Sequence, residues 1–166
     1  MRKVSKRPAV SKDRKKTPKE IPVSKSLLIV DSGKPSKVKR SYWLRAFRST
    51  SDYPKSTIRN GKWLIFALRE QIDEIWEKVK ATLEAGKLGN SAKVSTALPN
   101  PNSMDRRKHV ICVYTCDGED VADVRRIRES LREIGIVNKI PYKTDRATLE
   151  GKYQKSGSKR ISLYYE

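Results

Sequence analysis

Two segments of the chain repeat their apolar residues at the spacing of an amphipathic helix. In residues 70–85 the repeated positions are Ile72, Ile75, Trp76, Val79 and Leu83. In residues 119–134 they are Val121, Val124, Ile127, Leu131 and Ile134. Because residues three or four apart share one side of a helix, each segment predicts a helix with one buried face. Gly86 and Gly135 supply stop signals, and the arginines of the second helix are expected to point largely outward.

Shorter apolar or alternating segments predict strands around these helices. Residues 41–47 alternate as a half-buried strand does, with Tyr42, Leu44 and Ala46 on one side and Trp43, Arg45 and Phe47 on the other. Further strands are predicted at residues 62–67, 92–98, 109–115, 136–142 and 160–165. An apolar run at 27–30 is either an edge strand or an anchor for the residues before it. Strands mixed with two helices make the predicted fold class α+β.

The chain divides into a basic tail and one folded domain. Residues 1–40 hold 14 basic and 3 acidic residues, a net charge of +11 out of the formal +19. Residues 1–25 have almost no large apolar side chains, so we expect them to be disordered. Residues 26–166 have the size of a single domain. The tail residues Arg14, Lys15 and Lys16 are candidates for phosphate contacts or for a nuclear-import patch.

The excess of positive charge points to a polyanionic partner, with RNA or a ribonucleoprotein such as the ribosome first and acidic proteins as an alternative. No apolar segment has the length of a membrane helix or secretory signal, which predicts a cytoplasmic or, through residues 13–16, a nuclear protein. Cys112 and Cys116 are too far apart along a strand for a disulfide. His109 is the only histidine, and neither a metal site nor a cofactor is predicted.

Aromatic residues interleaved with cations are typical of proteins that stack RNA bases and pair with phosphates. Trp43 and Tyr53 are candidate stacking residues, although Trp43 fits a core position equally well. Arg45 and Arg48 beside them are candidate phosphate contacts. Trp63 and Trp76 are expected in the core, because their segments have buried periodicity. A Gly-containing segment farther along adds the candidate phosphate contacts Lys143, Arg146 and Lys152.

Several motifs in these elements resemble known families. The strand Gly61–Phe66 and the helix segment Asp73–Trp76 resemble the Gly-basic-Trp-Leu-Ile strand and the Trp-bearing helix of the cap-binding initiation factor 4E fold family. The basophilic leukaemia expressed protein family is resembled more closely, by residues 43–46, 61–66, 92–96, 110–115 and 164–166. This resemblance implies a curved, mainly antiparallel sheet backed by two helices.

The resemblance also bears on the site. Lys93 and the loop residues Arg106, Arg107 and Lys108 fall near the positions from which the cap binders contact phosphates. The roughly 15 residues between Phe47 and Trp63 are too few for the elements that carry both cap-stacking residues, so cap recognition is not expected.

The resemblance carries one alternative, phosphothreonine-lyase chemistry with Lys93, Lys108 and His109 as candidate catalytic residues. Lys108 and His109 are adjacent in a predicted strand and would face opposite ways. No paired carboxylates and no nucleophile triad stand out in the sequence, so we expect a binding protein and assign no catalytic residue.

Overall fold

The computed structural model describes residues 33–101, 103, 105–151 and 162–166. Their elements follow in the order β1 (Trp43–Phe47), β2 (Gly61–Leu68), α1 (Arg69–Glu84), β3 (Ser91–Ser95), β4 (Lys108–Thr115), α2 (Val121–Glu133), β5 (Pro141–Thr144), α3 (Asp145–Leu149) and β6 (Tyr164–Tyr165). The α+β class is confirmed. The predicted tail and the apolar run at 27–30 lie outside the described residues.

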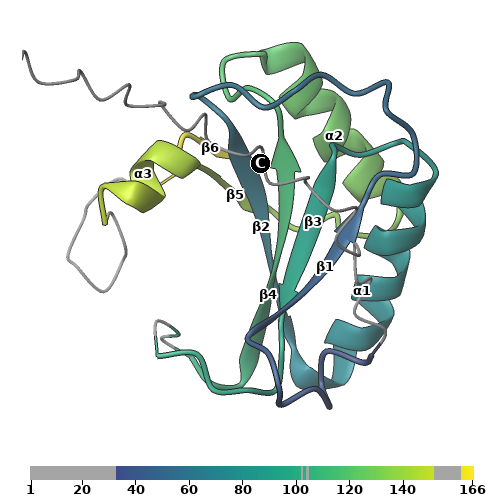
Figure 1. Ribbon diagram of the computed structural model, residues 1–166, viewed down its shortest axis with the longest axis vertical. Helices are drawn as coiled ribbons and strands as arrows, with labels where there is room; N and C mark the ends of the chain where they lie inside the picture. The colour runs from purple at the N-terminus through teal and green to yellow at the C-terminus, as the bar shows by residue number, and fades with distance from the viewer. Residues whose placement is uncertain (1–32, 102, 104, 152–161) are drawn as a thin grey trace, which may run out of the picture.

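The strands form one curved sheet in the order β1-β3-β4-β2-β5-β6, and every neighbouring pair is antiparallel. Both long helices, α1 and α2, lie against the same side of this sheet (Figure 1). The opposite side is concave and carries no long helix, and α3 stands at its margin (Figure 1). No described helix has both the length and the apolar character needed to cross a bilayer.

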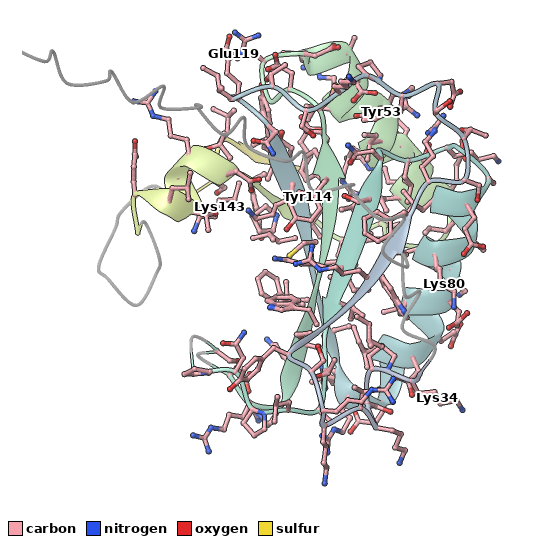
Figure 2. All side chains as sticks on the ribbon, in the orientation of Figure 1. Lys34, Tyr53, Lys80, Tyr114, Glu119 and Lys143 are labelled. Atoms are coloured by element: carbon pink, nitrogen blue, oxygen red, sulfur yellow. The ribbon has the colours of Figure 1, made fainter. Side chains whose placement is uncertain are left out.

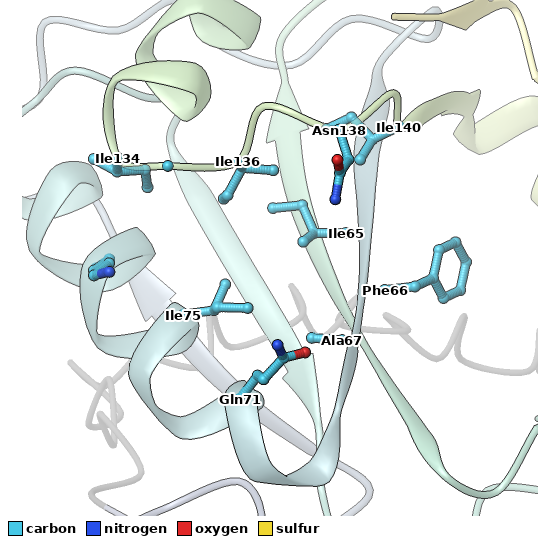
Figure 3. A pocket seen from close by; sticks show the side chains of 11 residues that line it. Ile65, Phe66, Ala67, Gln71, Ile75, Ile134, Ile136, Asn138 and Ile140 are labelled. Carbon is cyan, nitrogen blue, oxygen red and sulfur yellow. The ribbon is translucent and has the colours of Figure 1, made fainter.

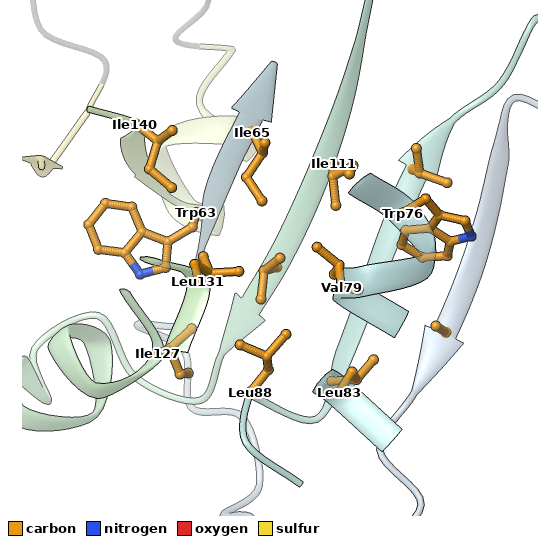
Figure 4. Close-up of a cluster of buried hydrophobic side chains, with 14 of the residues drawn as sticks. Trp63, Ile65, Trp76, Val79, Leu83, Leu88, Ile111, Ile127, Leu131 and Ile140 are labelled. Atoms are coloured by element: carbon orange, nitrogen blue, oxygen red, sulfur yellow. The ribbon is translucent and has the colours of Figure 1, made fainter. Parts of the chain in front are cut away.

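The core fills the space between the sheet and the two long helices (Figure 4). Trp63 and Trp76 are both buried in it, which confirms the prediction made for them. Trp63 lies on β2, and its indole Nε1 donates a hydrogen bond to the carbonyl oxygen of Val124 on α2 at 3.1 Å. This bond gives a partner to the only polar atom of the indole, which would otherwise be buried without a hydrogen bond.

The helix α2 differs from prediction at two positions. Val121, expected inward, is 39% exposed because it is the first residue of the helix. Arg128, expected outward with the other arginines, is completely buried. Its guanidinium donates to the carbonyl oxygens of Ile136 at 2.7 Å, Asn138 at 2.8 Å and Glu166 at 3.1 Å. The expected face is therefore corrected: these carbonyls replace the water that normally keeps arginine at the surface.

The segment after β5 also differs from prediction, because a third helix, α3, occupies part of the expected loop. Thr144 caps this helix, and its hydroxyl accepts a hydrogen bond from the amide of Ala147 at 3.2 Å. The predicted strand at 136–142 forms only from Pro141 onward.

A cationic and aromatic row on the concave face

The antiparallel register arranges the side chains of the concave face in rows that cross the sheet. The middle row consists of Arg45, Lys93, Cys112 and Leu64. The row above it consists of Tyr114, Lys62 and Lys143. Figure 2 shows Tyr114 and Lys143 projecting from this side of the sheet. Neighbouring strands lie about 4.8 Å apart, so residues of one row are within side-chain reach of each other.

Lys93 lies at the centre of these rows and is held by aromatic rings. Its ammonium nitrogen is 4.3 Å from the ring centroid of Trp43 and 5.7 Å from that of Tyr114. Among the described residues, neither Lys93 nor its neighbour Arg45 has a carboxylate within 4.0 Å. Burial lowers the pKa of Lys93, and the positive charges of Lys62 and Arg45 lower it further.

The upper row adds two buried lysines. Lys62 forms an ion pair with Asp145, donates to the hydroxyl of Thr148 at 3.1 Å and lies 5.6 Å from the ring centroid of Tyr114. Lys143 is opposite Lys62 on β5, and its pKa is lowered by burial first and by the charge of Lys62 second. The rows therefore keep an excess of positive charge after the pair with Asp145 is formed.

Cys112 lies between the cations of the middle row without neutralising them. Burial raises the pKa of its thiol to about 11, although Lys93 and Lys62 act in the opposite direction. The thiol is consequently protonated near neutral pH and contributes no negative charge to the face.

An apolar strip adjoins the cations on the same face. Phe66 projects from β2 on this side and is 55% exposed. In the register it is opposite Val110, and Ser95 of the next strand is opposite Trp43. The concave face thus combines flat apolar surface with cations, the combination that suits nucleobases linked by phosphates.

Arg48 and Tyr53 are not part of this face. Arg48 pairs with Asp52 at 2.9 Å and donates to the carbonyl oxygen of Leu88 at 2.7 Å. The hydroxyl of Tyr53 is hydrogen bonded to Asp123 of α2 and accepts from the amide of Cys116 at 3.1 Å. Both side chains therefore fasten the β1–β2 connection to the helical side of the sheet.

The remaining candidate cations are dispersed. Arg106, Arg107 and Lys108 are exposed at the β3–β4 turn, where Arg107 pairs with Asp105 at 3.2 Å. Arg146 is exposed on α3 and pairs with Glu150 at 2.9 Å. Lys152, Arg14, Lys15 and Lys16 lie outside the described residues.

The alternative catalytic residues do not converge. His109 is buried, and its Nδ1 lies 3.0 Å from the carbonyl oxygen of Ser95. Lys108 is exposed and follows the opposite side of the same strand, as the alternation predicts. Lys93 lies on the concave face, so the three groups surround no common substrate position.

Four residues of the face were missed from the sequence: Lys62, Phe66, Tyr114 and Asp145. Alternation places Lys62 on the opposite side of its strand from Trp63, and Tyr114 on the opposite side from Val113, a pattern that could have assigned both to the side away from the core. The pairing of Lys62 with Asp145 joins residues from distant parts of the chain and left no local pattern.

Comparison with known proteins gives two further findings. Residues 50–149 match the family of basophilic leukemia-expressed protein Bles03. Schistosome eIF4E complexed with m7GpppG and 4E-BP is similar in structure, with a TM-score of 0.58 and 16% identity over 82% of this chain and 76% of that chain. The corresponding m7GpppA complex gives a TM-score of 0.59, 14% identity and the same coverage.

Ascaris suum eIF4E-3 with an m2,2,7G cap is also similar, with a TM-score of 0.51 and 13% identity over 74% of this chain and 68% of that chain. At these identities the likeness establishes a shared fold. It confirms the curved sheet backed by helices that the sequence motifs predicted.

Proposed function

Because the chain belongs to the family of basophilic leukemia-expressed protein Bles03 and has an eIF4E-like fold, we propose that it binds RNA through its concave face. The RNA is free or part of a ribonucleoprotein such as the ribosome. Phosphates contact Arg45 and Lys93, and a base stacks on Trp43. One observation carries the proposal: Lys93 is held between aromatic rings and has no carboxylate partner in the described chain.

The electrostatics of the rows favour an anion. Burial has already removed part of the water from Lys93, which is why its pKa is lowered. A phosphate placed beside this ammonium would restore the favourable interaction that burial removed. The formal net charge of +19 adds a long-range attraction for any polyanion.

Aromatic surface favours RNA over polyanions that lack bases. Trp43 lies on the edge strand β1 and is only half-buried, so one part of its ring is open to a stacking base. Schistosome eIF4E holds m7GpppG on the same fold. Cap recognition is not included in the proposal, because residues 48–60 form neither a strand nor a helix that could carry a second stacking residue.

The division of the chain at residue 25 is part of the same proposal. Residues 1–25 would add phosphate contacts that are independent of RNA sequence, and residues 26–166 would form the domain that carries the concave face. Removal of the tail should then lower both the affinity and its salt dependence.

We expect Lys93→Glu to weaken binding of a single-stranded RNA by at least about 10-fold at moderate salt, since a phosphate contact is replaced by repulsion. The matched control is Lys87→Glu, which makes the same charge change beside α2 on the helical side. It should change affinity by less than about 3-fold. Fluorescence anisotropy of a labelled RNA across a salt series measures both, and the slope with salt should fall only for Lys93→Glu.

Equal losses in Lys93→Glu and Lys87→Glu would contradict the proposal, because they would reflect net charge alone. The variant Trp43→Ala distinguishes RNA from other polyanions. It should weaken the binding of RNA by about 1–3 kcal/mol and leave the binding of inorganic polyphosphate unchanged. If acidic peptides bind more tightly than RNA, the partner is a protein. Turnover of a phosphothreonine peptide that is lost in His109→Ala would support a lyase instead.

The lowered pKa of Lys93 predicts how binding depends on pH. RNA prefers the charged ammonium, and a lowered pKa means that the proton is lost at a lower pH than in an ordinary lysine. Affinity for an adenine-only RNA should therefore begin to fall at a lower pH than the titration of an ordinary lysine would give, and Lys93→Arg should remove most of that fall. Identical pH profiles for the two proteins would show that Lys93 does not contact phosphate.

A further inference from the structure

The strand β2 is longer than its neighbour on one side. Its whole length, Gly61–Leu68, pairs with β4, whereas only Gly61–Trp63 pairs with β5. Across the described part of the chain, no other backbone group forms a hydrogen bond with residues 64–68. Within the described residues, the β5 side of Leu64–Leu68 is therefore an open sheet edge whose main-chain donors and acceptors have no backbone partner.

This edge has none of the features that usually protect an open strand. Natural edges carry charged residues, prolines or bulges that prevent another strand from adding. Here all five residues are apolar: Leu64, Ile65, Phe66, Ala67 and Leu68. Phe66 is 55% exposed and Leu68 is 43% exposed, so apolar side chains also face solvent along the edge. An edge of this kind favours pairing with an added strand.

A hollow of about 250 Å³ lies beside the same edge (Figure 3). It opens between β2, α1 and the segment that joins α2 to β5. The branched side chains that line it are Ile65, Ile75, Ile134, Ile136 and Ile140. An extended peptide projects alternate side chains to opposite sides, so a strand added to β2 would aim one side chain toward this hollow. Gln71, Lys78 and Asn138 add polar groups to the lining, and the isoleucines favour a large side chain with an apolar body.

Cations stand at both ends of the open edge. Arg69 follows Leu68 directly, and Lys139 precedes Ile140 of the hollow. Both are exposed, and neither has a carboxylate within 4.0 Å among the described residues. Acidic residues at the two ends of an added strand would complement these charges.

We propose that the edge Leu64–Leu68 binds an extended segment of another protein by β-strand addition. The segment has alternating apolar residues, places one large side chain in the hollow and carries acidic residues toward Arg69 and Lys139. This site uses the main chain of Leu64–Leu68 at the edge of the sheet, whereas the proposed RNA contacts at Lys93 and Arg45 lie farther along the row that begins at Leu64.

A second copy of the chain is a poorer occupant. If two β2 edges paired in an antiparallel arrangement, β5 of each copy would stand in line with β2 of the other, where Arg69 begins α1. The two helices and β5 strands would then compete for the same space, and like charges would meet at Arg69. A single extended segment avoids both conflicts.

The test uses the full chain and the synthetic peptide DETVTITVDE. Titration followed by amide exchange should show saturable binding, with exchange slowed at least about 10-fold at amides within Leu64–Leu68. The same peptide with N-methyl groups at alternate residues cannot complete the ladder, and its affinity should fall at least about 10-fold. This comparison needs no protein variant.

Ile136→Asp and Val137→Asp form a matched pair of variants. Ile136 lines the hollow, whereas the adjacent Val137 is 69% exposed and does not. Only Ile136→Asp should lose affinity, about 10-fold or more, with both melting temperatures recorded to confirm folding. Equal binding of the N-methylated peptide would overturn the proposal. So would edge amides that are already protected in the free chain, because a second copy or the chain's own residues would then occupy the edge.

Discussion

Arg128→Met should lower the free energy of unfolding by about 3–5 kcal/mol. The guanidinium is completely buried and donates to three carbonyl oxygens, on Ile136, Asn138 and Glu166. Methionine fills a similar volume but donates no hydrogen bond, so three acceptors lose their partner in a place with little water. Urea denaturation of both proteins, analysed with a common slope, measures the difference.

Arg125→Met is the matched control, because Arg125 is exposed on the same helix. Its effect should stay within about 0.5 kcal/mol. Amide exchange adds a local test: the loss at Arg128 should speed exchange most at Ile140 and Glu166, whose backbones bond to each other at the end of the sheet. A loss below about 1 kcal/mol in Arg128→Met would mean that water replaces the guanidinium.

Gly89→Ala should destabilise the fold by at least about 2–3 kcal/mol, because the added methyl group meets the backbone. A Cβ on Gly89 would lie 1.9 Å from the carbonyl oxygen of Tyr114. Tyr114 belongs to β4, which is hydrogen bonded to β3 on one side and β2 on the other. Tyr114 therefore cannot move without breaking ladder hydrogen bonds, so relief of the contact would have to come from the connection between α1 and β3 that contains Gly89. Thermal and urea denaturation measure the loss.

Gly135→Ala separates steric contact from backbone conformation. Gly135 has a φ of +96°, and a Cβ there would meet nothing within 4 Å. Its substitution should cost about 1–2 kcal/mol from conformation alone. If Gly89→Ala costs no more than Gly135→Ala, the connection between α1 and β3 shifts to accommodate the methyl group.

Local patterns predicted most of the elements, and long-range pairing accounts for what they missed. The apolar spacing placed α1 almost residue for residue, because one helix face needs no information from elsewhere in the chain. Arg128 was misplaced because charged residues are seldom fully buried. Its position, four after Val124 and three before Leu131, nevertheless lies on the buried side of the helix.

The candidate site was predicted less completely than the fold. The structure brings the candidates Trp43, Arg45, Lys93 and Lys143 to one face of the sheet. Arg48 and Tyr53 belong to the opposite side. The side of the sheet on which a candidate residue lies depends on the order of the strands. That order follows from contacts between residues that are distant in the sequence. The rows that unite Lys93 with Tyr114 and Lys62 could not be derived before the register was known.

Alternation along the central strands has a consequence for how the protein tolerates sequence change. In β3 the residues Ser91, Lys93 and Ser95 face outward, while Ala92 and Val94 are buried in the core. When each residue of β3 is substituted in turn, the effects should therefore alternate: changes at outward positions should lower affinity, and changes at buried positions should lower expression. Inherited changes at outward positions can alter ligand preference while the scaffold stays intact, whereas a one-residue deletion within a strand would exchange the two sets and abolish both.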